Sequence, residues 1–358
     1  MRKIAWVSHP SFLNHHNSPG HPEAAQRLVS IEQALTAQQL RPYLERLTPH
    51  EATMEELCEV HSHAYVKWQW RMIDKAGKAK ARIQMDSDTH VTEGSWIAAL
   101  LAAGAGRTML DYLCTGRTIN AGFAAVRPPG HHALPQKPMG FCLFNNIAIA
   151  VHHAKKLDFK RIVVIDIDVH QGNGTQAIFY DDPGVLFFSL HRWPQWPHSG
   201  WFDEVGVREG TGYNVNIPLP RKTGDRGYLL ALKGIVDRIA REYRADLILV
   251  SAGYDAHQHD PIGEMRISTI GYGRIFQWLD ALASDLEVKL AIFLEGGYDP
   301  TALGESVAAS VRALTAEPGV VELHPQTGDE DPRLVDEYIE SAERHLAQYW
   351  TWLRPDAT

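Results

Sequence analysis

The sequence has few cysteines and no long apolar run. Its three cysteines form no CxxC pair and leave one over, which argues against a disulfide framework and a cysteine-ligated metal. No run of about 18 or more apolar residues is present, so no transmembrane helix is expected. The first residues lack an apolar segment long enough for a signal peptide. We therefore expect a cytoplasmic protein with reduced thiols and no membrane partner.

A tract of basic residues is also missing. The formal net charge is −8, from 35 Lys and Arg against 43 Asp and Glu, so no nucleic-acid partner is expected. With 44% hydrophobic and 22% charged residues, the composition is that of a folded protein. The number of histidines is high: the chain contains 19, several of them adjacent to one another.

Short apolar or β-branched runs alternate with segments of helical periodicity. This alternation predicts one α/β domain over residues 1–358, with a central, mostly parallel sheet and helices on both faces. Ligands of such sheets bind beyond the carboxyl ends of the strands. The predicted strands are 3–7, 122–126, 161–165, 185–190, 247–250 and 290–294, and the predicted helices are 23–38, 96–113, 228–243, 272–286 and 332–352. Asp331 is the expected N-cap of the last helix, with Pro332 as its first residue, and 317–330 is expected to be a surface loop.

The strongest local pattern is a hydrophobic run that continues directly into acidic and imidazole side chains. In extended backbone Asp166, Asp168 and His170 project to the same side. A second apolar run places Asp255 just past its carboxyl end. Carboxylate oxygens and one imidazole suit Zn²⁺, whose catalytic sites use three protein ligands and an open position. A single aspartate in such a place is more often a cap or turn residue, so this prediction depends on the combination.

Two further strand ends carry groups suited to acid–base chemistry. His131 and His132 follow a Pro-Pro-Gly turn. Adjacent residues cannot comfortably ligate one ion from a strand end, so they are better interpreted as an acid–base pair. Tyr298 follows Gly296 and Gly297, which permit a close approach of the backbone, and its phenol can donate a hydrogen bond to a developing oxyanion. Either motif alone would be weak.

Together, four segments resemble the zinc-dependent histone deacetylase family in their identity, order and approximate spacing. The resemblance implies the arginase/deacetylase fold and one Zn²⁺ per chain, bound by Asp168, His170 and Asp255. The segments are PPGHH (128–132), DIDVHQGNGTQ (166–176), SAGYDAHQHDP (251–261) and LEGGY (294–298), with further matches at 20–23, 88–94 and 140–142.

The resemblance also implies roles for the groups around the metal. His132 would be the general base and acid, His131 would give electrostatic support, and Tyr298 would polarise the carbonyl. Asp166 looks like the partner of His131. Asn173 replaces the carboxylate partner of His132, which is typical of the class II branch and should leave His132 less basic. A structural potassium ion is implied as well, at Asp166, Asp168, His170, Ser189 and Leu190.

By the same resemblance, a narrow tunnel leads to the metal. Phe141, next to Gly140, matches one wall, and Trp196 is the expected opposite wall, with Trp193 in reserve. Gly296 and Gly297 line the site. Asp88 matches a rim position that anchors the substrate backbone in some members. Ile262 occupies the gatekeeper position, where a glutamate would favour polyamines, although Glu264 lies two residues further on.

The expected reaction is hydrolysis of the amide of acetyl-lysine, or of a related small acyl-lysine, to the free amine and acetate. The substrate would be an acylated lysine peptide or protein, or an acetylated polyamine if the chain is an acetylpolyamine amidohydrolase. An arginase is disfavoured, because that family uses a two-manganese cluster with more ligands. A module that binds acyl-amines without cleaving them would require the loss of a ligand or of Tyr298, and neither is lost. Oligomer formation is left open.

Overall fold

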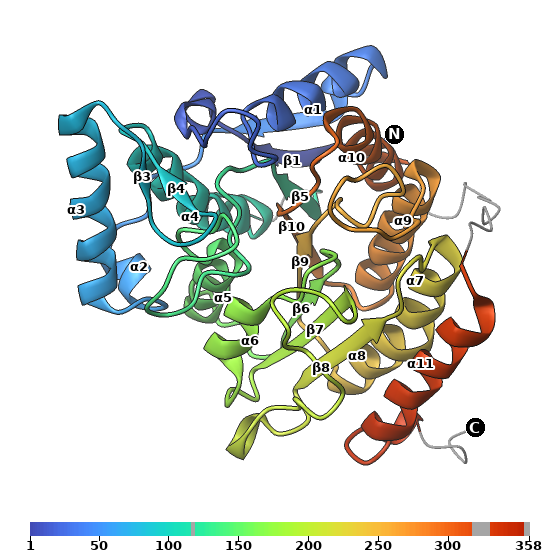
Figure 1. Cartoon of the computed structure of the whole chain (residues 1–358). Coiled ribbons are helices and arrows are strands. Elements are labelled where there is room, and N and C mark those ends of the chain that lie inside the picture. Colours follow the sequence, from blue (N-terminus) through green and yellow to red (C-terminus); the bar gives the residue numbers. More distant parts are fainter. Residues whose placement is uncertain (116–118, 317–329, 354–358) are drawn as a thin grey trace.

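A central sheet of eight parallel strands organises the chain (Figure 1). The computed structural model describes residues 1–115, 119–316 and 330–353. The strand order is β2-β1-β5-β10-β9-β6-β7-β8, and β3 and β4 form a separate antiparallel pair. The strands are β1 (Ile4–Val7), β2 (Leu44–Leu47), β3 (Ile83–Gln84), β4 (His90–Val91), β5 (Ala121–Ala124), β6 (Ile162–Asp166), β7 (Val185–Arg192), β8 (Asn214–Leu219), β9 (Leu247–Ala252) and β10 (Lys289–Leu294).

All six predicted strands are present, and the sheet is the predicted one. The two strands of the central sheet that the sequence did not predict, β2 and β8, lie at its two edges, and the separate pair β3 and β4 was not predicted either. In β2, the solvent-facing residues Glu45 and Arg46 interrupt the apolar pattern. In β8, Asn214, Asn216 and Pro218 do so, and proline is tolerated at an edge because its missing N–H is not needed there.

Helices cover both faces of the sheet (Figure 1). On one face α4 packs against α5 and several strands, and on the other α1, α10 and α9 form a continuous layer. None of the helices in the described ranges is both long and apolar enough to cross a membrane. The helices are α1 (Gln26–Ala37), α2 (Met54–Cys58), α3 (His63–Ala79), α4 (Ser95–Leu113), α5 (Asn146–Lys156), α6 (Asn173–Phe179), α7 (Asp225–Ala231), α8 (Asp237–Tyr243), α9 (Thr269–Asp285), α10 (Pro300–Thr315) and α11 (Pro332–Leu346).

The predicted helices all occur, with local differences. The segment predicted at 228–243 comprises α7, a π-helical turn at Leu232–Val236 and α8. The last helix ends at Leu346 rather than at 352, and Asp331 caps it by accepting N–H groups of Arg333 and Leu334. The predicted loop at 317–330 lies outside the described residues except for its last position. The helix α10 was not predicted, although Asp299 and Pro300 form an N-cap and first-turn pair that signals its start.

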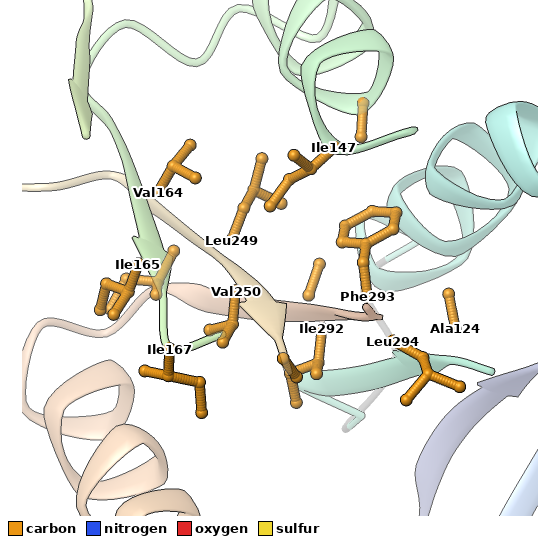
Figure 2. Packing of buried hydrophobic residues seen from close by; sticks show 14 of the residues in the cluster. Ala124, Ile147, Val164, Ile165, Ile167, Leu249, Val250, Ile292, Phe293 and Leu294 are labelled. Atoms are coloured by element: carbon orange, nitrogen blue, oxygen red, sulfur yellow. The ribbon is translucent and has the colours of Figure 1, made fainter. Parts of the chain in front are cut away.

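The core lies between the sheet and its two helical layers. Successive residues of a strand point to opposite faces. In Figure 2, Val164 and Leu249 point toward Ile147 of α5, whereas the next residues, Ile165 and Val250, point to the other side. All five side chains are fully buried. The central strands are therefore fixed from both faces, and the residues just beyond their carboxyl ends start from a rigid base.

Candidate active site

Three potential metal ligands meet where β6 and β9 end. Asp168 and His170 follow β6, and Asp255 follows β9. The His170 Nδ1 atom lies 3.1 Å from Asp168 Oδ1 and 3.1 Å from Asp255 Oδ2. One ligand atom from each residue lies within 4.8 Å of the others, and all three residues are buried. The structure thus brings together the three residues that the sequence predicted as zinc ligands.

Backbone hydrogen bonds orient both carboxylates. Asp168 Oδ1 accepts the His170 N–H at 2.9 Å, and Asp168 Oδ2 accepts the Gly296 N–H at 2.8 Å. Asp255 Oδ1 accepts the Val169 N–H at 2.9 Å. The segment after β6, the carboxylate after β9 and the turn after β10 are therefore tied to one another through these bonds.

A glycine after β10 leaves room for the carboxylates. A Cβ atom at Gly296 would lie 2.6 Å from Asp168 Oδ2 and closer still to Asp255 Oδ2. Such separations are shorter than real Cβ contacts, so any side chain at this position would displace the ligands. This packing explains why glycine stands in the turn between β10 and Tyr298.

The donor set fits a borderline divalent cation. Burial opposes the charged form of His170, but Asp168 and Asp255 raise its pKa to about 10. Burial and then Asp168 raise the pKa of Asp255 to about 7. Two carboxylates and one imidazole with three donor atoms suit Zn²⁺. Elsewhere in the described ranges, no other group of three or more His, Cys, Asp or Glu residues is close enough to hold a metal.

The two adjacent histidines lie beside this group, each with its own partner. His131 Nδ1 lies 2.9 Å from Asp166 Oδ2, and His132 Nδ1 lies 2.7 Å from Asn173 Oδ1. The two rings are 3.9 Å apart, and both residues are buried. Burial lowers the pKa of His131, but the nearby carboxylates of Asp166, Asp168 and Glu295 together raise it well above its usual value. Burial and the charge of His131 lower the pKa of His132 well below its usual value.

The turn that carries the histidine pair is held by a glutamate to which the sequence assigned no role. Glu295 Oε2 accepts the N–H groups of Gly130 and His131, at 2.7 and 3.1 Å. Its other oxygen accepts the hydroxyl of Ser251 at 3.1 Å. Burial is the main reason that the pKa of Glu295 rises to about 7. Glu295 lies within the LEGGY segment, so its place at the end of β10 was the available signal.

Tyr298 is positioned by two further residues that the sequence did not single out. Asp260 Oδ2 accepts the Tyr298 N–H at 2.7 Å, and Asp260 Oδ1 accepts that of Ile262 at 2.8 Å. Arg27 donates to the Gly297 carbonyl at 2.6 Å, and its guanidinium lies 5.2 Å from the centre of the Tyr298 ring. Burial, followed by the charge of Asp255, raises the pKa of Tyr298 well above its usual value, so its phenol stays protonated.

A buried ion network secures Arg27. Both oxygens of Glu23 accept hydrogen bonds from Arg127, and Arg27 lies 3.3 Å from Glu23 Oε1. These three side chains have no solvent exposure. Burial opposes the charged form of Glu23, yet Arg127 holds its pKa well below the usual range. Arg127 also donates to the Phe12 carbonyl at 2.7 Å, which links the N-terminal segment to the end of β5.

Aromatic rings enclose the approach to the site. The Phe141 ring lies 5.7 Å from the Tyr298 ring, and the Trp196 ring lies 4.7 Å from the His132 ring. Trp193 instead packs against Trp201 at 5.1 Å. A Cβ atom at Gly140 would lie 2.7 Å from Trp196, so glycine is needed between the two walls. This arrangement favours Trp196 over Trp193 as the second wall.

The expected rim residues lie around this approach. Asp88 is half-buried. The next residue, Thr89, accepts the Phe141 N–H at 3.1 Å, which places Asp88 near Phe141. Burial and then Asp86 raise the pKa of Asp88 to about 6. Ile262 is also half-buried, and its link through Asp260 places it near Tyr298.

Glu264, two residues beyond Ile262, does not have a free carboxylate. Its oxygens form ion pairs with Arg192 and Arg221, both at 2.6 Å. Arg192 ends β7, and its backbone N–H donates to the Val169 carbonyl at 2.9 Å. The glutamate therefore joins its loop to the neighbouring strand end.

Comparison with known proteins agrees with this geometry. Residues 21–314 match the histone deacetylase domain. The chain belongs to the histone deacetylase family. Its relatives include "Histone deacetylase 14, chloroplastic" of Arabidopsis thaliana, 38% identical over 84% of this chain and 74% of that protein. A "Probable deacetylase" of Archaeoglobus fulgidus is 39% identical over 82% of this chain and 80% of its own. The crystal structure of the HDA15 HD domain superposes with a TM-score of 0.88 and 32% identity, covering 99% and 97% of the two chains.

These similarities establish the class of reaction. The homologues are deacetylases, so this histone deacetylase family member is a hydrolase that acts on amide bonds. Its sheet and helical layers match the fold of the solved relative, which confirms the predicted fold class.

We predict that Gly296→Ala lowers both the metal content and the activity of this deacetylase, because the added methyl group would displace Asp168 and Asp255. Metal content is measured by elemental analysis after purification. Gly234→Ala is the matched control, since its Cβ would meet only the end of the Glu343 side chain, at 3.1 Å. Full metal occupancy in Gly296→Ala would contradict the assigned packing.

We further predict that Glu23→Gln reduces the free energy of unfolding by about 3–5 kcal/mol, because two buried guanidinium groups lose their counter-charge. Urea denaturation measures the change. Glu32→Gln, in the nearby helix α1, is the control. Glu32 pairs with Arg46 at the surface, so this change should remain within about 1 kcal/mol. Equal losses in both variants would show that the network is no stronger than a surface pair.

Proposed function

We propose that the chain catalyses zinc-dependent hydrolysis of acetyl-lysine, or of a related small acyl-lysine, to the free amine and the carboxylate. The observation that carries this proposal is the position of the histidine pair beside the three ligands. His131 Nε2 lies 3.8 Å from Asp168 Oδ1, and the rings of His132 and His170 lie 5.9 Å apart. A water molecule between them would have a base on one side and a Lewis acid on the other.

In this proposal Asp168, His170 and Asp255 hold Zn²⁺. Zinc, when bound, polarises the acyl carbonyl and lowers the pKa of water, which makes the water a nucleophile at neutral pH. The donor atoms required for this are all buried, so bulk water does not compete for them.

The chain's own residues would move the protons. The Asn173 carbonyl oxygen accepts from His132 Nδ1, so this nitrogen carries the proton and Nε2 is free to act as a base. His132 takes a proton from the attacking water and returns it to the departing amine. Tyr298 donates a hydrogen bond to the carbonyl oxygen as it becomes negative. Arg27 and Asp260 keep Tyr298 in place through the backbone of its turn.

Peptidyl acyl-lysine is the preferred substrate class in this proposal, and acetylated polyamine is the alternative. A second amine of a polyamine would need a free carboxylate at the rim. Ile262 has none, and the carboxylate of Glu264 is already paired with Arg192 and Arg221. The polyamine alternative therefore depends on Asp88, the remaining expected rim residue with a carboxylate, whose pKa burial and Asp86 raise to about 6. Phe141 and Trp196 would enclose the aliphatic part of the lysine.

Several sequence predictions remain predictions. The potassium site at Asp166, Asp168, His170, Ser189 and Leu190 is one. The single catalytic domain over residues 1–358 is another. The cytoplasmic location also stays a prediction, since the name of the Arabidopsis relative places that protein in the chloroplast. The proposal makes no statement about oligomer formation.

We predict that Tyr298→Phe lowers kcat about 10²–10³-fold, because the developing oxyanion loses one hydrogen-bond donor. Its zinc content should stay at the wild-type level, since the phenol is not a ligand. Steady-state rates and elemental analysis on the same sample measure both. Asp255→Ala is the contrasting variant and should lose zinc as well as activity. Normal turnover in Tyr298→Phe would overturn the role of the tyrosine.

The test of the substrate proposal compares initial rates on an acetyl-lysine peptide and on N-acetylputrescine or acetylspermidine. We expect the peptide to be the better substrate and EDTA treatment to abolish both activities, with recovery when Zn²⁺ is added. Faster hydrolysis of the polyamine would move the function to the acetylpolyamine amidohydrolases. Activity that survives complete metal removal would refute the zinc mechanism.

A further inference from the structure

A second pocket with the chemistry of a cation site lies away from the candidate active site. It is formed between α3 and the start of α4, next to the β3–β4 pair (Figure 1). Its volume is about 380 Å³. It is lined by the aromatic residues Trp70 and Trp96, the acidic residues Asp74 and Glu93, the basic residue Lys78, and Ile73 and Gly77. Trp70 is 47% exposed, which is unusual for such a large apolar ring. Indole faces and carboxylates together favour an alkylammonium or guanidinium group.

The shape of the pocket depends on a glycine. Gly77 lies in α3, where glycine is an unfavourable helix residue. A Cβ at this position would approach the Glu93 side chain to 3.3 Å. Trp96 is held from behind by the Phe144 ring, at 6.0 Å. Packing thus holds Trp96, whereas Trp70 is 47% exposed and the Glu93 side chain is 70% exposed.

The two carboxylates are not committed to strong partners. Lys78 lies 2.6 Å from Asp74, and Lys80 lies 3.4 Å from Glu93. These lysine side chains are 77% and 79% exposed, so each pair is screened by water and contributes little stability. A cation that also contacts the two indoles gains an interaction that neither lysine pair has. An incoming basic side chain can therefore displace these lysines.

The chain itself limits how far the pocket can lie from the expected rim of the candidate site. Asp88, at the rim beside Phe141, precedes Glu93 by five residues in the chain. An extended segment of this length spans at most about 18 Å. A peptide in extended form would reach the pocket with a residue about five positions from its acyl-lysine.

We propose that this pocket binds a lysine or arginine side chain of the peptide that carries the acyl-lysine. The proposal rests on the proposed function, because it assigns the same substrate a second point of contact. It makes the chain selective for acyl-lysines that lie near another basic residue.

The test uses acetyl-lysine peptides with one lysine placed at each position about three to seven residues away on either side. Each is compared with the peptide that has norleucine, a neutral side chain of similar length, at that position. For the wild-type chain, the ratio of kcat/KM between lysine and norleucine peptides should reach about three- to tenfold at the best position, through KM.

Three variants connect this ratio to the pocket. Trp70→Ala and Asp74→Asn should bring the ratio toward one, whereas Lys78→Ala should increase it, because a competing cation is removed. Trp68→Ala is the matched control. It is a 37% exposed tryptophan on the same helix that does not line the pocket, and it should leave the ratio unchanged. Because each variant is compared with itself on two peptides, a general loss of folding cancels.

Each outcome decides the proposal. Hydrolysis of both peptides with a ratio near one at every position overturns the pocket and leaves the proposed function intact. If no acetyl-lysine peptide is hydrolysed, the proposed function fails. Calorimetric titration with the same acetylated lysine and norleucine peptides then tests the pocket alone, and equal binding of both would overturn it. A change in molar mass on Trp70→Ala, without a change in the ratio, would identify an interface between copies and also overturn it.

Discussion

Parallel pairing of the four central strands is the constraint on which the candidate site depends. Because β5, β10, β9 and β6 run in the same direction, the residues that follow them meet at one edge of the sheet. The histidine pair follows β5, the metal ligands follow β6 and β9, and Tyr298 follows β10. Groups separated by more than 160 residues in the chain thus become neighbours without a long loop having to position any of them.

Burial makes the hydrogen bonds between these strand ends matter. In a water-poor interior, an unpaired carboxylate or guanidinium is costly, so each must find partners. Glu295 satisfies the turn of the histidine pair, Asp260 satisfies the turn of Tyr298, and Glu23 satisfies two arginines. None of these three residues is proposed to contact the substrate. They fix the distances among the groups that are, namely the histidine pair, the candidate metal ligands and Tyr298.

The features of the fold and the site that could be predicted were those that depend on a single continuous segment of sequence. Buried parallel strands are uniformly apolar, so Asp168 and Asp255 stand out where such runs end. The edge strands β2 and β8 were missed because their mixed composition resembles that of loops. Contacts between distant segments could not be read from either segment alone. Arg127 with Glu23, and Glu264 with Arg192, are pairs of this kind.

The hydrogen bonds to the ligand carboxylates have a consequence for how the protein matures. Both oxygens of Asp168 and one oxygen of Asp255 are oriented by backbone N–H groups at this edge of the sheet. In the proposed zinc site the cradle is therefore shaped by folding, and the cation would not have to assemble it. Loading with metal would then follow folding as a separate step. The free energy of ion binding is available to hold the ion, with little of it consumed in ordering the chain.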